Sequence, residues 1–198
     1  MRDSYLENKH HILQSGRRLI AQKGFTGLGL SEILSAADVP KGSFYHYFDS
    51  KEDYGRELIE YYVADYLATL DKLLLQERHG SSARQRLLNY WGHWLETQCC
   101  EMAEHKCLVV KLSAEVADLS EPMRLALHAG TQAFIARIAA LISTGIDEAS
   151  LHTVLDPCRT AEMLYQLWLG ASLLSKLGRD RQALEGAMEV TRRVLVAP

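Results

Sequence analysis

Apolar residues recur at intervals of three and four along most of this 198-residue chain, which is the period of amphipathic helices. Ser4 with Glu7 has the spacing of a capping box, and Gly24 ends the first apolar run. Ser50 with Asp53 opens a long later run. Helices are predicted over about 4–23, 30–38, 40–48, 51–78, 81–100, 107–116, 121–146, 157–177 and 181–196. The pattern predicts an all-α fold of about nine helices.

One segment is open to a second interpretation, because 107–116 is short, apolar and partly β-branched. Those properties also suit a strand. No other segment of the chain has the period-two alternation of a strand that would pair with it, so we predict a helix here.

The stretch 39–51 places four aromatic residues and a histidine between two turn signals. In a short helix, Phe44 and Phe48 lie four apart on one face and can enter the core, whereas the polar residues point elsewhere. Small Gly42 near the amino end permits close approach of another surface, such as a nucleic-acid backbone. Together with the short helix predicted over 30–38, this stretch has the arrangement of a helix-turn-helix unit, whose second helix enters the DNA major groove.

Charge is unevenly distributed along the chain. The net charge is −3, yet residues 1–51 carry seven Lys or Arg against five Asp or Glu. An acidic protein is an unusual DNA-binding protein. Two copies of a locally basic amino-terminal module would nevertheless face the phosphates if the chain dimerises.

The composition indicates a folded, soluble protein, since 47% of the residues are hydrophobic. We find no signal peptide and no apolar run approaching the roughly 18 residues of a membrane span, so we expect a cytoplasmic protein without a membrane partner. The four cysteines are then expected to be thiols, and their spacing matches no zinc motif. We expect no metal and no cofactor. The cysteines are Cys99, Cys100, Cys107 and Cys158.

The amino-terminal pattern resembles the signature of TetR-type repressors over about residues 8–54. Four segments carry the resemblance: Gly24-Phe25, residues 30–39, residues 42–48 and Ser50-Lys51-Glu52. Asp38 stands where the family usually has glycine; Asp tolerates the left-handed conformation that such a turn requires. Gly29-Leu30 replace the usual Thr or Ser pair, which makes phosphate contacts from that cap less certain. The resemblance implies a DNA-binding domain over 1–50 and a helical sensing and dimerisation domain over 51–198.

In this family the recognition helix reads bases and its flanks contact phosphates. The matching positions are Lys41, Ser43, Tyr45, His46, Tyr47 and Lys51. Lys41 is suited to guanine or phosphate, and Lys51 to the backbone. His46 is equally compatible with an exposed residue that makes no contact.

Dimerisation is implied by the same resemblance, because the last two long helices of TetR-like proteins pair with their copies as a four-helix bundle. The segment 161–177 has few charges on any face, and such a helix must be covered on both sides. A central helix of a monomeric bundle is the alternative.

Cys107 is the second chemical candidate. Its predicted place at a helix amino end, with His105 and Lys106 before it, favours the reactive thiolate. A cysteine that opens an apolar helix is otherwise often an inert small hydrophobe. The segments 107–121, 27–32 and 164–171 resemble the electrophile-sensing branch of the family, typified by the repressor of N-ethylmaleimide reductase. That branch implies a cysteine whose modification releases DNA, and Cys107 is the matching position.

Control by other residues stays open at this stage. Cys99, Cys100, Cys158 and Lys176 are further candidates for sensing, although each has an ordinary structural explanation. Aromatic residues that would line a pocket for a noncovalent ligand are Trp91, Trp94, Tyr165 and Trp168.

No phosphate loop, nucleophile elbow or paired-carboxylate pattern is present, so an enzyme is not expected. The sequence therefore predicts a homodimeric repressor on a palindromic double-stranded DNA operator, released by electrophiles or oxidants. The alternatives are release by a noncovalent small ligand, or a helical interaction protein without DNA function. Operator, inducer, regulated genes and direction of regulation are not given by the sequence.

Overall fold

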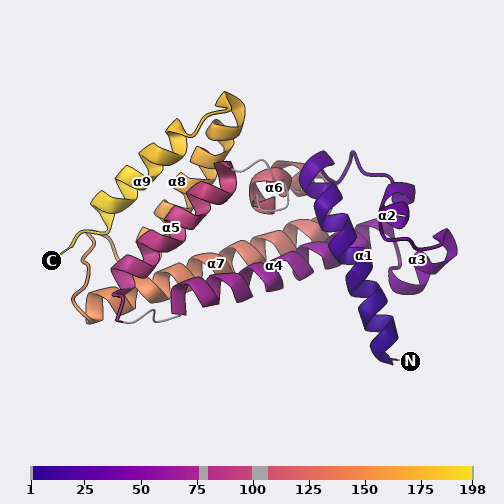
Figure 1. Cartoon of the computed structure of the whole chain (residues 1–198), viewed down its shortest axis with the longest axis horizontal. Coiled ribbons are helices and arrows are strands. Elements are labelled where there is room, and N and C mark those ends of the chain that lie inside the picture. Colours follow the sequence, from indigo (N-terminus) through magenta and orange to yellow (C-terminus); the bar gives the residue numbers. More distant parts are fainter. Residues whose placement is uncertain (1, 76–79, 100–106, 198) are drawn as a thin grey trace. The chain divides into compact units, whose positions relative to one another are not determined.

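The computed structural model describes residues 2–75, 80–99 and 107–197, and within these ranges the chain forms nine α-helices (Figure 1). In chain order they are α1 (Arg2–Lys23), α2 (Leu30–Ala36), α3 (Lys41–Tyr47), α4 (Lys51–Leu75), α5 (Ala83–Cys99), α6 (Leu108–Leu119), α7 (Glu121–Asp147), α8 (Pro157–Gly178) and α9 (Gln182–Val194). The extended pairing found there is an isolated bridge between His152 and Val196. The all-α prediction is confirmed, and the ambiguous segment after Cys107 is a helix.

The predicted turn and cap chemistry holds at most helix ends. Gly24 after α1 has φ 81°, and Asp38 between α2 and α3 has φ 52°, the left-handed conformation that Asp tolerates. The Asp53 amide donates to Ser50 Oγ at 3.0 Å at the start of α4. Before α8, the Asp156 carboxylate accepts from two backbone amides. One cap prediction is wrong: α1 already begins at Arg2, two residues before Ser4, because water can satisfy the first amides of a helix without a capping side chain.

Packing divides the chain into two compact units. The first contains Met1–Asp65 and Met102–Gly130, and the second contains Tyr66–Glu101 and Thr131–Pro198. α4 and α7 contribute residues to both units. The functional division at residue 50 stays a prediction; by packing, α6 and the first part of α7 belong with the amino-terminal helices.

The core of the first unit holds α3 to α1 and α4 through aromatic rings. Phe44 and Phe48, predicted to share one face, are both buried, with ring centroids 5.1 Å apart. Tyr54 of α4 completes the group at 5.6 and 5.1 Å from these two rings. A Cβ on Gly16 of α1 would overlap the Tyr54 hydroxyl, so the glycine permits this close packing.

The core of the second unit is built on one face of α8. The buried residues of that helix are Thr160, Ala161, Leu164, Tyr165, Trp168, Ala171, Ser172 and Ser175. Its other face carries exposed apolar side chains, including Met163, Leu173, Leu174 and Leu177. α9 covers part of α8 and has its own buried row of Leu184, Ala187, Met188 and Thr191.

α7 qualifies the expectation about membranes. By length and composition this helix is apolar enough to cross a membrane, with a mean hydropathy of 1.5 over an 18-residue window, of which 39% is buried. Core helices of soluble proteins pass the same test. The sequence prediction missed this window because it searched for an uninterrupted apolar run, and small and polar residues alternate with Leu and Ile in α7.

Candidate DNA-binding surface and sensor cysteine

The recognition helix α3 buries one side and exposes the other. Phe44 is fully buried and Tyr45 is 61% exposed. Lys41 and His46 are exposed as well, and Ser43 and Tyr47 are partly exposed. The polar side chains predicted to meet DNA therefore lie on an accessible face of a helix that is fixed from behind by two phenylalanines.

Tyr5 of α1 supports the end of this helix. Its hydroxyl donates to the His46 carbonyl oxygen at 3.3 Å, and its ring lies 5.4 Å from His46 and 4.9 Å from Tyr47. His46 and Tyr47 thus have a neighbour within the chain, which fixes their rings. The sequence analysis missed Tyr5, since nothing local indicates that residues 41 positions apart meet.

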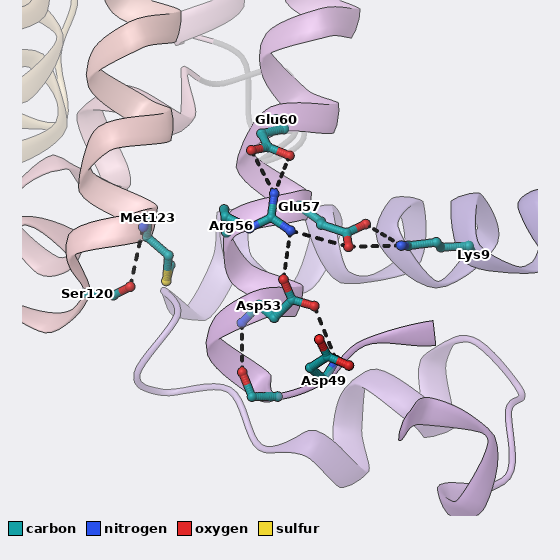
Figure 2. A network of polar contacts seen from close by, with 9 residues as sticks. Lys9, Asp49, Asp53, Arg56, Glu57, Glu60, Ser120 and Met123 are labelled. Carbon is teal, nitrogen blue, oxygen red and sulfur yellow. Dashed lines mark hydrogen bonds and ion pairs between the residues drawn. The ribbon is translucent and has the colours of Figure 1, made fainter. Parts of the chain in front are cut away.

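A charged network anchors the amino end of α4 directly after α3 (Figure 2). Arg56 contacts Asp53 at 2.7 Å, Glu60 at 2.7 Å and Glu57 at 3.5 Å. Glu57 also pairs with Lys9 of α1 at 2.6 Å. The Lys9 ammonium lies 5.1 Å from the Phe48 ring centre, so the network ties α1, the end of α3 and α4 together.

Lys51 has a partner inside the chain. Its Nζ donates to the Phe25 carbonyl oxygen at 3.2 Å and lies 4.8 Å from the centre of the Phe25 ring. Phe25 belongs to the turn between α1 and α2. The predicted phosphate contact of Lys51 stays a prediction, and an operator phosphate would have to share or replace this carbonyl.

The same turn is held from the other side by α6. The Glu115 carboxylate accepts from the Phe25 amide at 3.1 Å, and from both the amide and the hydroxyl of Thr26. One turn earlier, Lys111 Nζ donates to the Gln22 carbonyl oxygen at 3.2 Å at the end of α1. Two side chains of α6 therefore hold the segment that leads into the helix-turn-helix unit.

Glu115 is ionised in this arrangement. Its partial burial opposes ionisation, but the donors from Thr26 and Phe25 outweigh that effect and lower the pKa of the carboxyl. Gly24 leaves room for the carboxylate, because a Cβ there would lie 2.8 Å from Glu115 Oε2. We refer to these contacts of Glu115 with Phe25 and Thr26 as the Glu115 clamp.

Cys107 occupies the N-cap position of α6 and is buried. The Tyr62 hydroxyl of α4 donates to its Sγ at 3.6 Å and accepts from the Leu108 amide at 3.3 Å. The amides of Val110 and Val109 also act on the sulfur. Cys107 thus lies at the amino end of the helix whose later turns hold the clamp.

The structure corrects the expected state of this thiol. Burial raises the pKa of Cys107, and the opposing effects of the Val110 amide, the Tyr62 hydroxyl and the Val109 amide are smaller. The helix amino end was predicted correctly, but its effect is outweighed, so the thiol is protonated in this form of the protein. His105 and Lys106, the other two expected influences, lie outside the described residues.

The four aromatic residues predicted to line a ligand pocket do lie together. Trp91 stacks on Trp168 with centroids 5.0 Å apart, and Trp94 meets Tyr165 edge-on at 5.7 Å. All four are buried. The indole N–H of Trp94 donates to Ser172 and that of Trp168 to Thr191, whereas Trp91 Nε1 finds no acceptor among the described residues. Whether the cluster admits a ligand stays a prediction.

The remaining sensing candidates lie on the surface. Cys99 and Cys158 are exposed cysteines, and Lys176 is exposed in the last turn of α8. Cys100 lies outside the described residues. Among the residues that the structure describes, no group of three or more His, Cys, Asp or Glu side chains is placed to bind a metal.

Comparisons with known proteins agree with this geometry. Residues 12–54 match the family described as bacterial regulatory proteins, tetR family, and residues 83–191 match the tetracyclin repressor-like C-terminal domain. The HTH-type transcriptional repressor NemR of Escherichia coli (strain K12) is 42% identical over 97% of this chain and 96% of NemR. The HTH-type transcriptional repressor DhaR of Mycobacterium sp. (strain GP1) is 29% identical over 95% of this chain and 92% of DhaR.

A solved structure gives the same result. The reduced form of E. coli NemR superposes with a TM-score of 0.91 at 41% identity, covering 97% of this chain and 98% of that chain. Fold, motif and sequence similarity extend over nearly the whole length of both proteins. The chain belongs to the TetR family of bacterial DNA-binding transcriptional regulators.

Proposed function

We propose that this protein is a homodimeric repressor that binds a palindromic operator and releases it when Cys107 is modified by an electrophile or an oxidant. The observation that carries the proposal is the position of α6, which has a buried thiol at its amino end and the Glu115 clamp near its other end. The relatives named above are repressors, and one of them has been solved in a form described as reduced. We expect the protein to act in the cytoplasm, where operator DNA is found.

DNA recognition is assigned to the exposed face of α3. Tyr45 and Lys41 project from a helix that the core holds rigidly, which suits base and phosphate contacts, respectively. Two copies would bind half-sites about 34 Å apart or a multiple of that distance. Tyr45→Ala is expected to abolish specific binding, whereas Lys41→Ala is expected to reduce the salt dependence of binding, both measured by fluorescence anisotropy at several salt concentrations. Unchanged affinity and salt slope in both variants would contradict this surface.

Dimerisation is assigned to the outer faces of α8 and α9. Leu174 is 60% exposed and Leu177 is 73% exposed, so within the described part of one chain this apolar face is uncovered. A Cβ added to Gly170 in α8 or to Gly186 in α9 would meet nothing within 4 Å. Small residues on an open apolar helix face permit close approach of a second helix, and a copy of this chain supplies the matching face.

Sensing is assigned to Cys107 because its sulfur is buried, and the packed surroundings leave no room for the atoms that an electrophile adds. The thiol reacts only after α6 opens enough to admit the reagent and the proton has left to solvent. The thiolate then forms a carbon–sulfur bond with the β carbon of an α,β-unsaturated carbonyl, the double-bond electrons move to the carbonyl, and water supplies the proton to the α carbon. The added atoms occupy the space beside Tyr62 and prevent the amino end of α6 from returning to its position.

Movement of α6 is transmitted to the DNA-binding helices through the Glu115 clamp. Glu115 and Lys111 contact residues within 22–26, at the end of α1 and in the turn that follows it, so a shift of α6 moves the segment that leads into the helix-turn-helix unit. A dimer whose two recognition helices lose their spacing no longer matches both half-sites.

The test is a gel shift with operator DNA, with and without N-ethylmaleimide, on wild type and Cys107→Ser. Wild type is expected to release the operator and the variant to keep it. A Cys99→Ser, Cys158→Ser double variant serves as the control and should release like wild type, because neither thiol belongs to α6 or to the Glu115 clamp. Release of Cys107→Ser by the same reagent would refute the assignment.

The second candidate is release by a noncovalent ligand in the aromatic cluster. The observation in its favour is Trp91 Nε1, a buried donor without an acceptor among the described residues, which a ligand oxygen would satisfy. Release by a nonreactive compound, reversed by dilution and unaffected by Cys107→Ser, would support it. The interaction protein without DNA function is excluded by the family assignment.

A further inference from the structure

The Tyr62 hydroxyl has a defined direction at the sensor site. It accepts the Leu108 amide proton at 3.3 Å and donates to Cys107 Sγ at 3.6 Å. Since the amide occupies a lone pair of the oxygen, the hydroxyl proton is left to point toward the sulfur. One buried side chain of α4 therefore contacts both the first amide of α6 and the reactive atom.

The ring that carries this hydroxyl is itself fixed. Tyr62 is 2% exposed, and the guanidinium of Arg17 from α1 lies 5.3 Å from its ring centre. Arg17 is held in turn by Asp65, one turn further along α4, at 2.6 Å. The ring is thus held from α1 while its hydroxyl contacts the first amide of α6, which leaves the hydroxyl little freedom to turn away from the sulfur.

Few other groups stabilise charge on the sulfur. The described residues place the amides of Val109 and Val110 and the Tyr62 hydroxyl near it, and no charged side chain contacts it there. His105 and Lys106 lie outside the described residues. The Tyr62 hydroxyl is the side-chain donor that meets the thiol among the described residues.

We propose that Tyr62 is a positioning residue for the reaction of Cys107, one that keeps the sulfur at the amino end of α6 and hydrogen-bonds the thiolate as it attacks. This inference rests on the proposed function of Cys107. In the step, the thiol proton leaves to water, the sulfur pair forms the bond to carbon, and Tyr62 retains its own proton throughout. A thiolate among apolar residues is stabilised by such a fixed donor, because few other groups there can hydrogen-bond it.

The test compares wild type with Tyr62→Phe, which keeps the ring and removes the oxygen. Alkylation of Cys107 by N-ethylmaleimide is followed by peptide mass spectrometry at pH values from 6 to 10. Loss of one hydrogen bond to a charged sulfur is expected to slow the alkylation at neutral pH about tenfold. The midpoint of the rise in alkylation rate with pH is expected to move up by about one pH unit. At high pH the two rates converge, because the thiolate is then fully formed in both proteins.

Tyr61→Phe is the matched control. Tyr61 neighbours Tyr62 on α4, but its ring lies 5.7 Å from His10 of α1. Its pH profile is expected to follow wild type. A Tyr62→Phe profile that superimposes on wild type would overturn the inference, and so would faster alkylation at every pH, which would mean that the hydroxyl only closes the site.

Failure of the inference and failure of the proposed function give different results. If Cys107 is alkylated in wild type but the operator stays bound, the sensor assignment is wrong, whatever the rates. If fully alkylated Tyr62→Phe releases the operator like wild type while its alkylation profile is unchanged, the sensor assignment holds and the inference about Tyr62 is wrong. The expected result is a shifted profile with normal release after full alkylation, since the hydroxyl acts before the adduct forms.

Discussion

Replacing Glu115 with glutamine tests the route from the sensor to DNA. The carboxylate uses both oxygens: Oε2 accepts from the Phe25 amide, and Oε1 accepts from the Thr26 amide and hydroxyl. A glutamine side chain has a single acceptor oxygen, and its NH₂ group would face a backbone N–H at the other position. The substitution therefore removes contacts on one side of the clamp and places two donors against each other.

The cost follows from the hydrogen bonds lost. A hydrogen bond to a charged group contributes about 1.5–3 kcal/mol when buried, and Glu115 is only half-buried, so we expect Glu115→Gln to lower the free energy of unfolding by roughly 1–2 kcal/mol. The turn keeps its own backbone bonds, including Gly24 N–H to the Ile20 carbonyl at 2.9 Å. The variant is thus expected to fold and to bind the operator without electrophile.

The pH dependence of that cost has a definite sign. The pKa of Glu115 is lower in the folded protein than in the unfolded chain, where it is about 4.3. The carboxylate therefore stabilises the fold fully at pH values above the unfolded pKa, and this stabilisation is lost as the pH falls through the folded pKa. Urea unfolding at pH 7 should separate wild type from Glu115→Gln, and the difference should narrow below about pH 4.

Operator release is the decisive measurement. After complete alkylation of Cys107, wild type should lose operator affinity by roughly 5- to 150-fold, as is typical of coupled sites, and the loss in Glu115→Gln should be a clearly smaller factor. Asp118→Asn, which removes an exposed carboxylate from the same helix, should behave like wild type. Full release of alkylated Glu115→Gln would refute a route through the clamp.

Three further results are expected. Leu174→Glu should convert the dimer to monomer in light scattering, because it places a charge on an apolar helix face, whereas Val154→Glu in a fully exposed loop should not. Gly24→Ala should lower the free energy of unfolding by about 1–2 kcal/mol in urea titrations, since φ is 81° there and the new methyl would crowd Glu115. Phe44→Ala should cost about 3–5 kcal/mol, and a thermal melt near that of wild type would contradict its place in the core.

Local patterns explain why so much of the fold could be predicted. The spacing of Phe44 and Phe48 identified two core residues, and Asp38 was expected in the left-handed conformation that it adopts. Gly24 and Ser50 marked helix ends through chemistry that acts within a few residues. Helix bounds follow from the same short-range physics.

The contacts at the site could not be predicted, because they join residues far apart in the chain. Glu115 is about 90 positions from Phe25, and in the sequence it is one more carboxylate on a helix surface. The protonation state of Cys107 was predicted from its neighbours in sequence, whereas burial among residues distant in the sequence decides it. A periodic pattern shows which face of a helix is buried, but not which side chains of another helix meet it.

The first compact unit has a consequence for synthesis of the protein, because it is assembled from two separate stretches, Met1–Asp65 and Met102–Gly130. At the usual rates of translation, the ribosome needs about 3 to 13 s to make the residues between positions 65 and 130. Until position 119 has been made, the turn after α1 lacks α6 and with it the Glu115 clamp. The nascent helix-turn-helix unit therefore acquires its regulated geometry only after the helix that begins at the cysteine has been made.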